Sequence, residues 1–259
     1  MILDEIAAKT VLRIEEEKKK TSLAELRLRA ECMEQRQGRG FYESLSELGM
    51  SYICEVKKAS PSKGVIATEF PYMDIAKEYE EAGASAISVL TEPYYFQGSN
   101  QYVKEISAAV STPCLRKDFT VDEYMIYEAK LLGASAVLLI CAILEQDRLV
   151  RYLNLAHELG LDALVETHDA EEVKRALDSG ARIIGVNNRN LKTFEVDIHN
   201  CMELRHLVPK DRIFVAESGI HTEDDIKMLT EAKVDAMLIG EALMRQADKK
   251  ATLAKWKSL

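Results

Sequence analysis

Short apolar stretches recur along the chain from residue 51 onward, and longer amphipathic segments separate them. Five of the junctions share one pattern, in which a helical segment ends at Gly, or at Lys233 in the last copy, and an apolar run begins within a residue or two. Glycine readily takes the left-handed conformation that ends a helix. The copies are EAGASAISVL (81–90), LLGASAVLLI (131–140), ELGLDALVE (158–166), DSGARIIGV (178–186) and EAKVDAMLIG (231–240). The pattern predicts alternating helices and strands.

Eight strands are predicted, at 51–57, 84–90, 113–117, 134–140, 162–166, 182–186, 212–216 and 235–239. Helices are predicted between them at 71–82, 100–110, 122–132, 145–159, 169–179, 197–207 and 222–231, and a last short helix begins near Glu241. Asp169 with Glu172, and Thr222 with Asp225, have the spacing of helix caps. Eight strand–helix units in 259 residues favour a single α/β (β/α)₈ barrel, a TIM barrel. The alternative is a doubly wound open sheet, although no glycine-rich dinucleotide motif follows the first strand.

Residues 1–48 have a different pattern. Apolar residues at helical spacing, followed by EEEKKK, predict one amphipathic helix over 1–20. A second helix runs from Thr21 to about Met33, and a third short one spans 41–48. These helices have no strand of their own to cover. We therefore expect a helical extension (1–48) that packs over the mouth of the barrel (49–259), within one structural domain.

Composition narrows the function classes. A net charge of −9 argues against a nucleic-acid binder, which normally carries a basic face. The start of the chain lacks the pattern of a signal peptide, and the longest apolar run, 134–144, is too short to span a membrane. Five scattered cysteines suggest reduced thiols rather than a zinc site or a disulfide framework. We expect a cytoplasmic protein, monomeric or at most a weak homodimer.

Charged residues stand at the predicted strand ends, where the chemistry of barrel enzymes gathers. The first strand opens into the loop of SYICEVKKASPSKG (51–64). Because strand side chains alternate, Glu55 and Lys57 share a face with Ile53, and Lys117 and Glu166 also point inward. Other polar residues at strand ends are Asn187, Arg189, Glu217 and Ser218.

Two lysines and two glutamates in a partly dry mouth can perform acid–base chemistry without a metal. Desolvation and a neighbouring ammonium group would lower the pKa of a lysine, while a carboxylate opposes that. The alternative is a purely structural ring of salt bridges. No metal is expected, because these residues include no cluster of His, Asp or Cys ligands. The histidines are interpreted as surface or supporting residues, and His168 alone lies near a strand end.

A second signal lies in AESGI (216–220) and LIGEALM (238–244). Gly219 and Gly240-Glu241 follow the last two strands, where barrels often bind a phosphate on backbone N–H groups. Together they predict a phosphorylated small-molecule substrate. Arg189 and Asn187 suit a carboxylate, although a tight NNRN turn that hydrogen-bonds within itself would explain them equally well.

Taken together, the motifs resemble those of the indole-3-glycerol phosphate synthases of tryptophan biosynthesis. EVKKASPSKG, LTE, LRKDF, LVETH, GVNNRNLKTF, VAESGI and IGEALM appear in the family's order, and the match covers the whole chain. Lys58 stands where many members have Arg. The resemblance implies a lyase that converts 1-(2-carboxyphenylamino)-1-deoxyribulose 5-phosphate to indole-3-glycerol phosphate, CO₂ and water without a cofactor.

The resemblance also implies roles for individual residues. Lys117 would be the general acid at the ketone oxygen, and Lys57 and Glu166 would serve the dehydration step. Glu55 would hold Lys57 in place, and Glu217 and Ser218 would complete the polar wall. The substrate carboxylate would bind to Asn187, Arg189 and Ser60, and the phosphate to the backbone of Gly219, Gly240 and Glu241.

Two rivals remain open at this point. One is another barrel enzyme acting on a phosphorylated sugar, such as a phosphoribosylanthranilate isomerase. That reaction usually needs a Cys and Asp pair, and Cys54 faces away from Glu55. The other is a catalytically inactive barrel kept as a binding partner, which should have lost one of the five residues Glu55, Lys57, Lys117, Glu166 and Asn187. All five are present.

Overall fold

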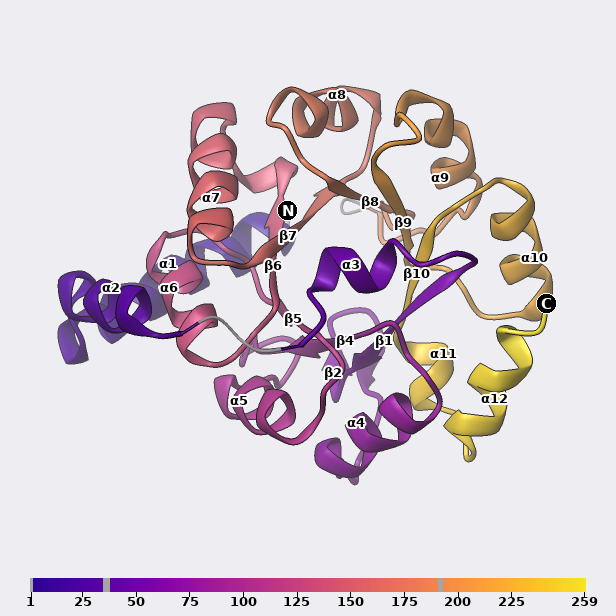
Figure 1. Cartoon of the computed structure of the whole chain (residues 1–259), viewed down its shortest axis with the longest axis horizontal. Coiled ribbons are helices and arrows are strands. Elements are labelled where there is room, and N and C mark those ends of the chain that lie inside the picture. Colours follow the sequence, from indigo (N-terminus) through magenta and orange to yellow (C-terminus); the bar gives the residue numbers. More distant parts are fainter. Residues whose placement is uncertain (1, 35–37, 191–192) are drawn as a thin grey trace.

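The computed structural model describes residues 2–34, 38–190 and 193–259. Met1, residues 35–37 of the predicted extension and residues 191–192 of the GVNNRNLKTF motif lie outside the described residues. Eight parallel strands close into a barrel in the order β1-β10-β9-β8-β7-β6-β5-β4, and β4 pairs with β1 (Figure 1). The predicted (β/α)₈ barrel is confirmed, and the open-sheet alternative is wrong. The strands are β1 Ser51–Val56, β4 Ala86–Leu90, β5 Cys114–Lys117, β6 Ala136–Ile140, β7 Asp162–Thr167, β8 Ile183–Asn187, β9 Ile213–Glu217 and β10 Ala236–Ile239.

Helices surround the barrel, and their bounds follow the predicted periodicity closely. Thr222 and Asp225 form a reciprocal capping box, and Asp169 accepts a hydrogen bond from the backbone of Glu172. Lys233 takes a φ of 60° at the place that glycine holds in the other copies of the repeat. The helices are α4 Tyr72–Glu81, α5 Asn100–Ala109, α6 Tyr124–Leu131, α7 Gln146–Glu158, α8 Ala170–Asp178, α9 His199–Leu204, α10 Glu223–Glu231 and α11 Glu241–Met244, with 3₁₀ turns η1 Cys141–Ile143 and η2 Arg205–Leu207.

Two small elements differ from the expectation. The loop after β1 folds into a short antiparallel ribbon of β2 (Ala59–Ser60) and β3 (Gly64–Val65), although proline and glycine predicted only a loop. A further helix, α12 (Lys249–Trp256), follows α11. Its sequence, KKATLAKW, offers only two large apolar residues, Leu253 and Trp256, and both are buried. Tertiary burial, rather than periodicity, identifies this helix.

Because strand side chains alternate, the apolar residues form two cores, one inside the barrel and one between the barrel and the helices. Residues that point into the barrel form one cluster, which includes Ile53, Leu115 and Leu164. Residues that point outward, such as Cys54 and Val165, pack with the helices in a second cluster. The predicted inward direction of Glu55, Lys117 and Glu166 follows from these neighbours, because each lies two residues beyond an interior residue of its strand.

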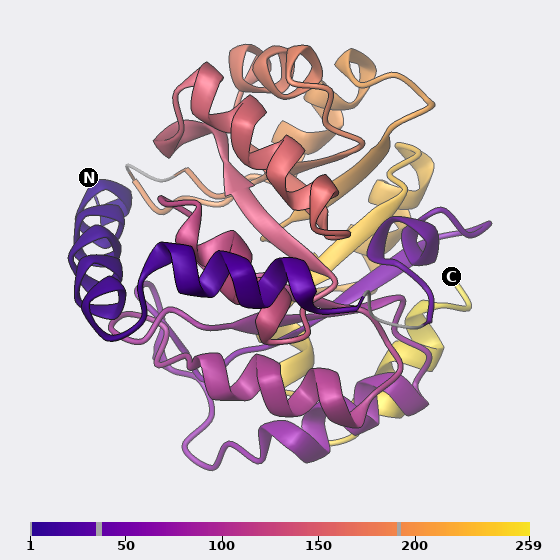
Figure 2. The same ribbon diagram turned by 60° about the vertical axis from the view of Figure 1, so that its left-hand side comes forward.

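The three helices of the extension lie at different places on the barrel (Figures 1 and 2). α1 (Ile2–Lys20) brings Ile2, Leu3 and Ile6 to the carboxyl ends of the strands. α2 (Leu23–Cys32) packs on α6. The expectation of an extension over the mouth therefore holds only for α1.

α3 (Phe41–Leu45) closes the opposite end of the barrel. The backbone N–H of Tyr42 donates to Asp162, the first residue of β7, over 2.8 Å. Phe41 and Leu45 are buried together with the residues that point into the barrel. A barrel has two open ends, and these side chains fill the one that carries no chemistry. Because extension and barrel share this core, we propose that residues 1–48 and 49–259 form one structural unit.

Candidate active site

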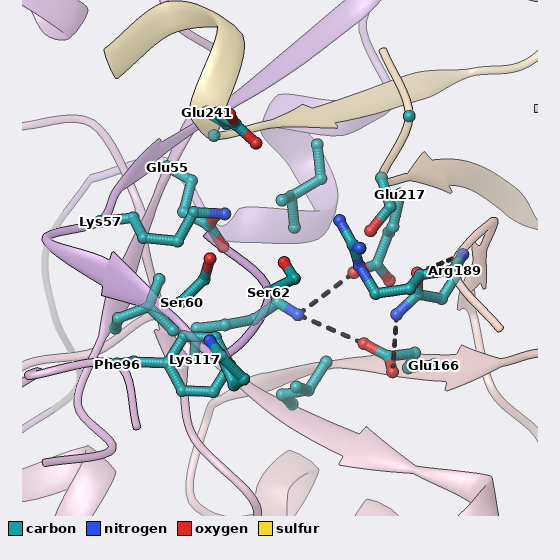
Figure 3. A pocket seen from close by; sticks show the side chains of 18 of the residues that line it. Glu55, Lys57, Ser60, Ser62, Phe96, Lys117, Glu166, Arg189, Glu217 and Glu241 are labelled. Carbon is teal, nitrogen blue, oxygen red and sulfur yellow. Dashed lines mark hydrogen bonds and ion pairs between the residues drawn. The ribbon is translucent and has the colours of Figure 1, made fainter. Parts of the chain in front are cut away.

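A pocket opens at the carboxyl ends of the strands, and Figure 3 shows it from close by. All twelve candidate residues named from the sequence line it. They are Glu55, Lys57, Ser60, Lys117, Glu166, Asn187, Arg189, Glu217, Ser218, Gly219, Gly240 and Glu241. They come from six different strands and the loops that follow them, so only closure of the barrel brings them together.

Lys117 lies at the centre of the charged groups. Its Nζ atom is 3.2 Å from Glu166 Oε2 and 3.3 Å from Glu217 Oε2, and the three side chains are at most 14% exposed. Glu166 Oε1 accepts a hydrogen bond of 3.2 Å from the side-chain amide of Asn187. Strands β5, β7, β8 and β9 thus present one cation between two buried carboxylates.

This environment corrects the expected pKa of Lys117. Burial favours the neutral amine, but Glu217, Glu166 and Glu55 outweigh it and raise the pKa of Lys117 above its ordinary value. A neighbouring ammonium group could have lowered this pKa, but Lys57 forms its own ion pair with Glu55, with Nζ and Oε2 2.5 Å apart, and the net direction is upward. Lys117 is therefore protonated at neutral pH, and its carboxylate neighbours hold this proton more tightly than an ordinary lysine would.

The two carboxylates beside Lys117 are driven apart in pKa. Burial opposes ionisation of Glu166, yet Lys117, His168 and Asn187 hold the pKa of Glu166 well below its usual range. For Glu217, burial outweighs the attraction of Lys117 and raises the pKa to about 7, and repulsion by Glu166 acts in the same direction. Pairs of acids with separated pKa values are typical of sites that donate and accept protons.

Two glycines leave room for these acidic side chains. A Cβ atom on Gly185, in the middle of β8, would lie 2.1 Å from Glu217 Oε1. A Cβ atom on Gly240 would lie 2.2 Å from Glu55 Oε2 and 2.7 Å from Lys57 Nζ. The place of Gly240 after the last strand predicted a role in phosphate binding, whereas no local pattern points to Gly185, because only the packed barrel shows which side chains cross above a strand.

The loop after β8 forms the hydrogen-bonded turn that NNRN suggested, and its side chains also reach the pocket. Asn187 Oδ1 accepts the backbone N–H of Arg189 over 3.0 Å, and Arg189 donates to the carbonyl of Phe194 over 3.3 Å. The turn is thus hydrogen-bonded within itself, while Asn187 also reaches Glu166 and Arg189 lines the pocket.

The loops after β9 and β10 form the opposite wall. Ser218 and Gly219 have φ values of 66° and 80°, which turns the chain sharply at the rim. The Glu241 carboxylate is engaged by Arg245 over 3.0 Å and lies 4.0 Å from Lys63. These cations offset the negative charge of Glu241 beside a position proposed for an anion.

Apolar side chains beyond the twelve candidate residues complete the pocket. They are Ile2, Leu3, Ile6, Leu90, Phe96, Phe119, Leu138, Ile140, Phe194, Ile220, Leu238 and Ala242. The rings of Phe96 and Phe119 lie 6.0 Å apart. Phe119 belongs to the LRKDF motif and could have been found from it. The residues of α1 could not, because they are distant in sequence from every strand.

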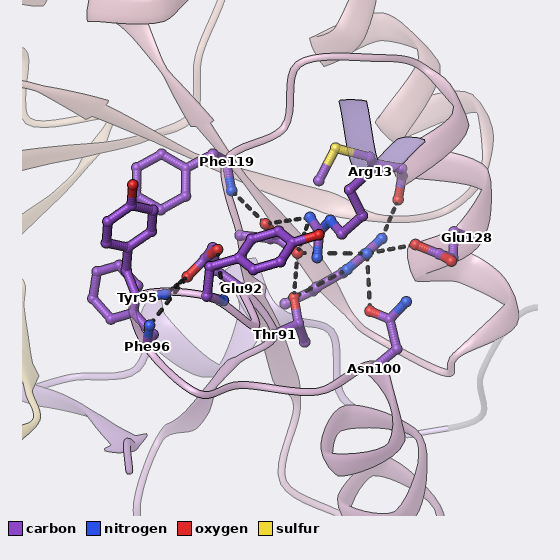
Figure 4. Close-up of polar contacts among 12 residues, drawn as sticks. Arg13, Thr91, Glu92, Tyr95, Phe96, Asn100, Phe119 and Glu128 are labelled. Atoms are coloured by element: carbon purple, nitrogen blue, oxygen red, sulfur yellow. Dashed lines mark hydrogen bonds and ion pairs between the residues drawn. The ribbon is translucent and has the colours of Figure 1, made fainter. Parts of the chain in front are cut away.

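Buried ionic contacts hold this wall in place (Figure 4). Glu92 accepts the backbone N–H groups of the loop that carries Phe96. Arg13 of α1 reaches both carboxylate oxygens of Asp118 over 2.9 Å, and Asp118 also accepts the backbone N–H of Phe119. Asp118 is 1% exposed. The extension is thus anchored next to Lys117, at the strand end that bears it.

A closed (β/α)₈ barrel with a pocket of lysine–glutamate pairs and apolar side chains at its strand ends is the architecture of a barrel enzyme. Comparison with known proteins gives the particular family. The family model described as "Indole-3-glycerol phosphate synthase" matches residues 3–256. The chain therefore belongs to the indole-3-glycerol phosphate synthase family, as the ordered motifs predicted, and with it to the carboxy-lyases of tryptophan biosynthesis.

Similar curated proteins cover the full length of the chain. The indole-3-glycerol phosphate synthase of Ruminiclostridium cellulolyticum is 55% identical over 255 residues, which is 98% of each chain. That of Lachnoclostridium phytofermentans is 52% identical over 270 residues, and the alignment covers 100% of each chain. Similarity of this extent, with every proposed catalytic side chain present, argues against the inactive-barrel alternative.

Solved structures of similar fold are more distant in sequence. The 3-hexulose-6-phosphate synthase of Salmonella typhimurium aligns with a TM-score of 0.66 at 14% identity, covering 81% of this chain and 97% of its own. Thiamine phosphate pyrophosphorylase of Pyrococcus furiosus aligns with a TM-score of 0.61 at 16% identity, covering 83% and 96%. They support the barrel fold. Within the described part of the chain, no helix has the length and apolarity that crossing a membrane requires.

Proposed function

We propose that this chain closes 1-(2-carboxyphenylamino)-1-deoxyribulose 5-phosphate to indole-3-glycerol phosphate, with release of CO₂ and water. The observation that carries the proposal is the protonated Lys117 between Glu166 and Glu217, at a pocket with an apolar wall. Such a pocket can take an aromatic ring on Phe96 and Phe119 while a ketone faces the ammonium group.

Ring closure needs a proton donor at the ketone. As the aryl carbon that bears the carboxylate attacks the ketone carbon, negative charge develops on the ketone oxygen. Lys117 donates to this oxygen, which becomes a hydroxyl group. Loss of CO₂ then returns the bonding electrons to the ring and restores its aromaticity.

Dehydration needs both an acid and a base. Lys57, held by Glu55, protonates the departing hydroxyl group, which leaves as water. Glu166, whose pKa is lowered, takes the proton from the neighbouring carbon, and the indole double bond forms. Glu217, with a pKa of about 7, is suited to return a proton to Lys117 between turnovers.

The anionic groups of the substrate fix its orientation. Arg189, Asn187 and Ser60 are assigned to the carboxylate, because a guanidinium group with neighbouring hydrogen-bond donors suits a planar anion. The backbone of Gly219, Gly240 and Glu241, together with Ser218, is assigned to the phosphate, at the end of the barrel where such sites are common.

The test is direct. Purified protein is mixed with the carboxyphenylamino deoxyribulose phosphate, and indole absorbance and fluorescence are followed. A signal that grows with enzyme concentration, together with equimolar CO₂, supports the proposal. Absence of turnover by folded wild-type protein would refute it, and an isomerase assay with phosphoribosylanthranilate would then test the other barrel chemistry.

We also propose that the enzyme works as a cytoplasmic monomer. The pocket already draws cations, carboxylates and apolar side chains from one chain, so a second copy is not needed to complete it. Analytical ultracentrifugation at assay concentrations tests the oligomeric state. A weak homodimer would appear as a sedimentation coefficient that rises with concentration.

A further inference from the structure

His168 occupies a place that neither the motif roles nor the proposed reaction explains. It follows β7, two residues beyond Glu166, and its ring lies between two carboxylates. Nδ1 is 3.0 Å from Glu172 Oε2, and Glu172, in the first turn of α8, also accepts the backbone N–H of His168 over 2.8 Å. The carbonyl oxygen of His168 accepts the side-chain amide of Asn200 over 3.1 Å. Ring and backbone are therefore fixed from two helices.

The other ring nitrogen faces Glu166. His168 Nε2 is buried and makes no hydrogen bond among the described residues, yet it lies 3.4 Å from Glu166 Oε1. Nδ1 is bound to Glu172, and Nε2 points to the carboxylate of Glu166, the proposed base. A small rotation of Glu166, as when Lys117 turns toward a bound ketone, would close this gap to a hydrogen bond.

We propose that His168 is a positioning residue for Glu166: the Glu172–His168 pair holds the Glu166 carboxylate ionised and in place when Lys117 engages the substrate. This inference rests on the proposed role of Glu166. When Lys117 turns to the substrate, Glu166 loses its lysine partner, and a buried carboxylate without a cation would bind a proton. The charged ring of His168 would then keep Glu166 ionised.

The surrounding charges are consistent with this role. Glu166 faces Lys117 from β5, Glu217 from β9 and His168 from its own loop, and Asn187 from β8 donates to it. His168 faces Glu166 and Glu172. Burial opposes protonation of the ring, but the two carboxylates raise the pKa of His168 to about 10. The ring therefore carries a positive charge over the working range of pH.

The proposal is tested on the full-length enzyme with His168→Gln, which removes the charge and keeps a polar side chain. The acid limb of the kcat profile should move to higher pH by roughly one unit, so that kcat falls by up to about tenfold at pH values below that limb. At pH 8 the loss should be less than about threefold. KM should change little, because His168 does not line the pocket. Glu172→Gln should move the limb in the same direction by a smaller amount.

His199→Gln is the matched control. His199 pairs with Asp197 over 2.8 Å, but both side chains are more than 60% exposed and His199 does not line the pocket. Its profile should match that of wild type. A purely structural His168 would lower thermal stability and leave the acid limb where it is, and that outcome would overturn the proposal.

A measurement independent of turnover separates this inference from the proposed function. The ring resonance of His168, assigned by its loss in His168→Gln, is titrated by NMR. It should remain that of a charged imidazolium through pH 8, and its midpoint should fall in Glu172→Gln. A wild-type midpoint near the ordinary 6.5 would overturn the proposal. If the ring stays charged but wild-type enzyme fails to convert the substrate, the proposed function is what fails.

Discussion

Gly185 offers a way to displace one carboxylate of the proposed catalytic group without altering any charged residue. In Gly185→Ala the new methyl group would lie 2.1 Å from Glu217 Oε1, whereas ordinary contact begins at 3.4 Å. The carboxylate must therefore move by about 1.3 Å. Glu217 Oε1 makes no hydrogen bond among the described residues, so the movement is opposed mainly by the ion pair of Oε2, which would leave its place 3.3 Å from Lys117 Nζ.

The magnitude follows from the size of the displacement. An extra methyl group in a packed interior costs about 1–3 kcal/mol of unfolding free energy. A 1 Å misplacement of a catalytic group lowers kcat by roughly 10²-fold. We expect both effects in Gly185→Ala, with KM changed by less than about threefold because the residues assigned to the substrate's anionic groups are untouched.

A double-mutant cycle identifies the cause. Unfolding free energy is measured by urea denaturation for wild type, Gly185→Ala, Glu217→Ala and the double variant, and kcat is measured in the indole assay. If the clash is with the carboxylate, Gly185→Ala should cost almost nothing in the Glu217→Ala background, a coupling of about 1–3 kcal/mol. An equal cost in both backgrounds would refute the reasoning and place the strain at Leu164, whose Cδ1 is 3.1 Å from the same position.

Four further predictions concern other parts of the site. Lys117→Arg and Lys117→Met should each lose roughly 10²–10⁴-fold in kcat, with little effect on folding. If Lys117→Arg keeps most of kcat, Lys117 acts only as a fixed charge and the general acid is Lys57. The pKa of Glu217 is raised from the usual 4.5 to about 7, so between these pH values the folded protein keeps a proton that the unfolded chain loses. The free energy of unfolding should therefore fall as pH rises from 4.5 to 7. Urea denaturation of Glu217→Gln should show a weaker dependence of this free energy on pH. In Gly219→Val, a branched side chain at a φ of 80° should stop inorganic phosphate from competing with substrate, and unchanged competition would place the phosphate elsewhere. Arg13→Met should raise KM roughly tenfold by loosening α1 beside the pocket, whereas Lys18→Met, which removes a more exposed ion pair to Asp122 over 2.7 Å, should not.

Periodicity was a strong guide to the barrel because every repeat carries the same local chemistry. A helix stop, an apolar strand and a polar strand end follow one another in the same order in each repeat. The alternation of strand side chains is enough to predict that Lys117 and Glu166 point inward. Periodicity did not predict at which end of the barrel each helix of the extension packs. An amphipathic helix shows that it needs an apolar surface but not which one, and the structure placed α1 at the mouth and α3 at the opposite end.

Spacing along the chain was enough to identify the strands, the inward-facing acids and bases and, through ordered motifs, the family. These depend on spacing within single strand–helix units. Only the tertiary structure decided the charge state of Lys117, the room that Gly185 leaves for Glu217, the place of α1 and the position of His168 behind Glu166. Each of these depends on distances between residues of different units. Such distances are set by closure of the barrel and by the burial that closure imposes, and no local pattern in the chain contains them.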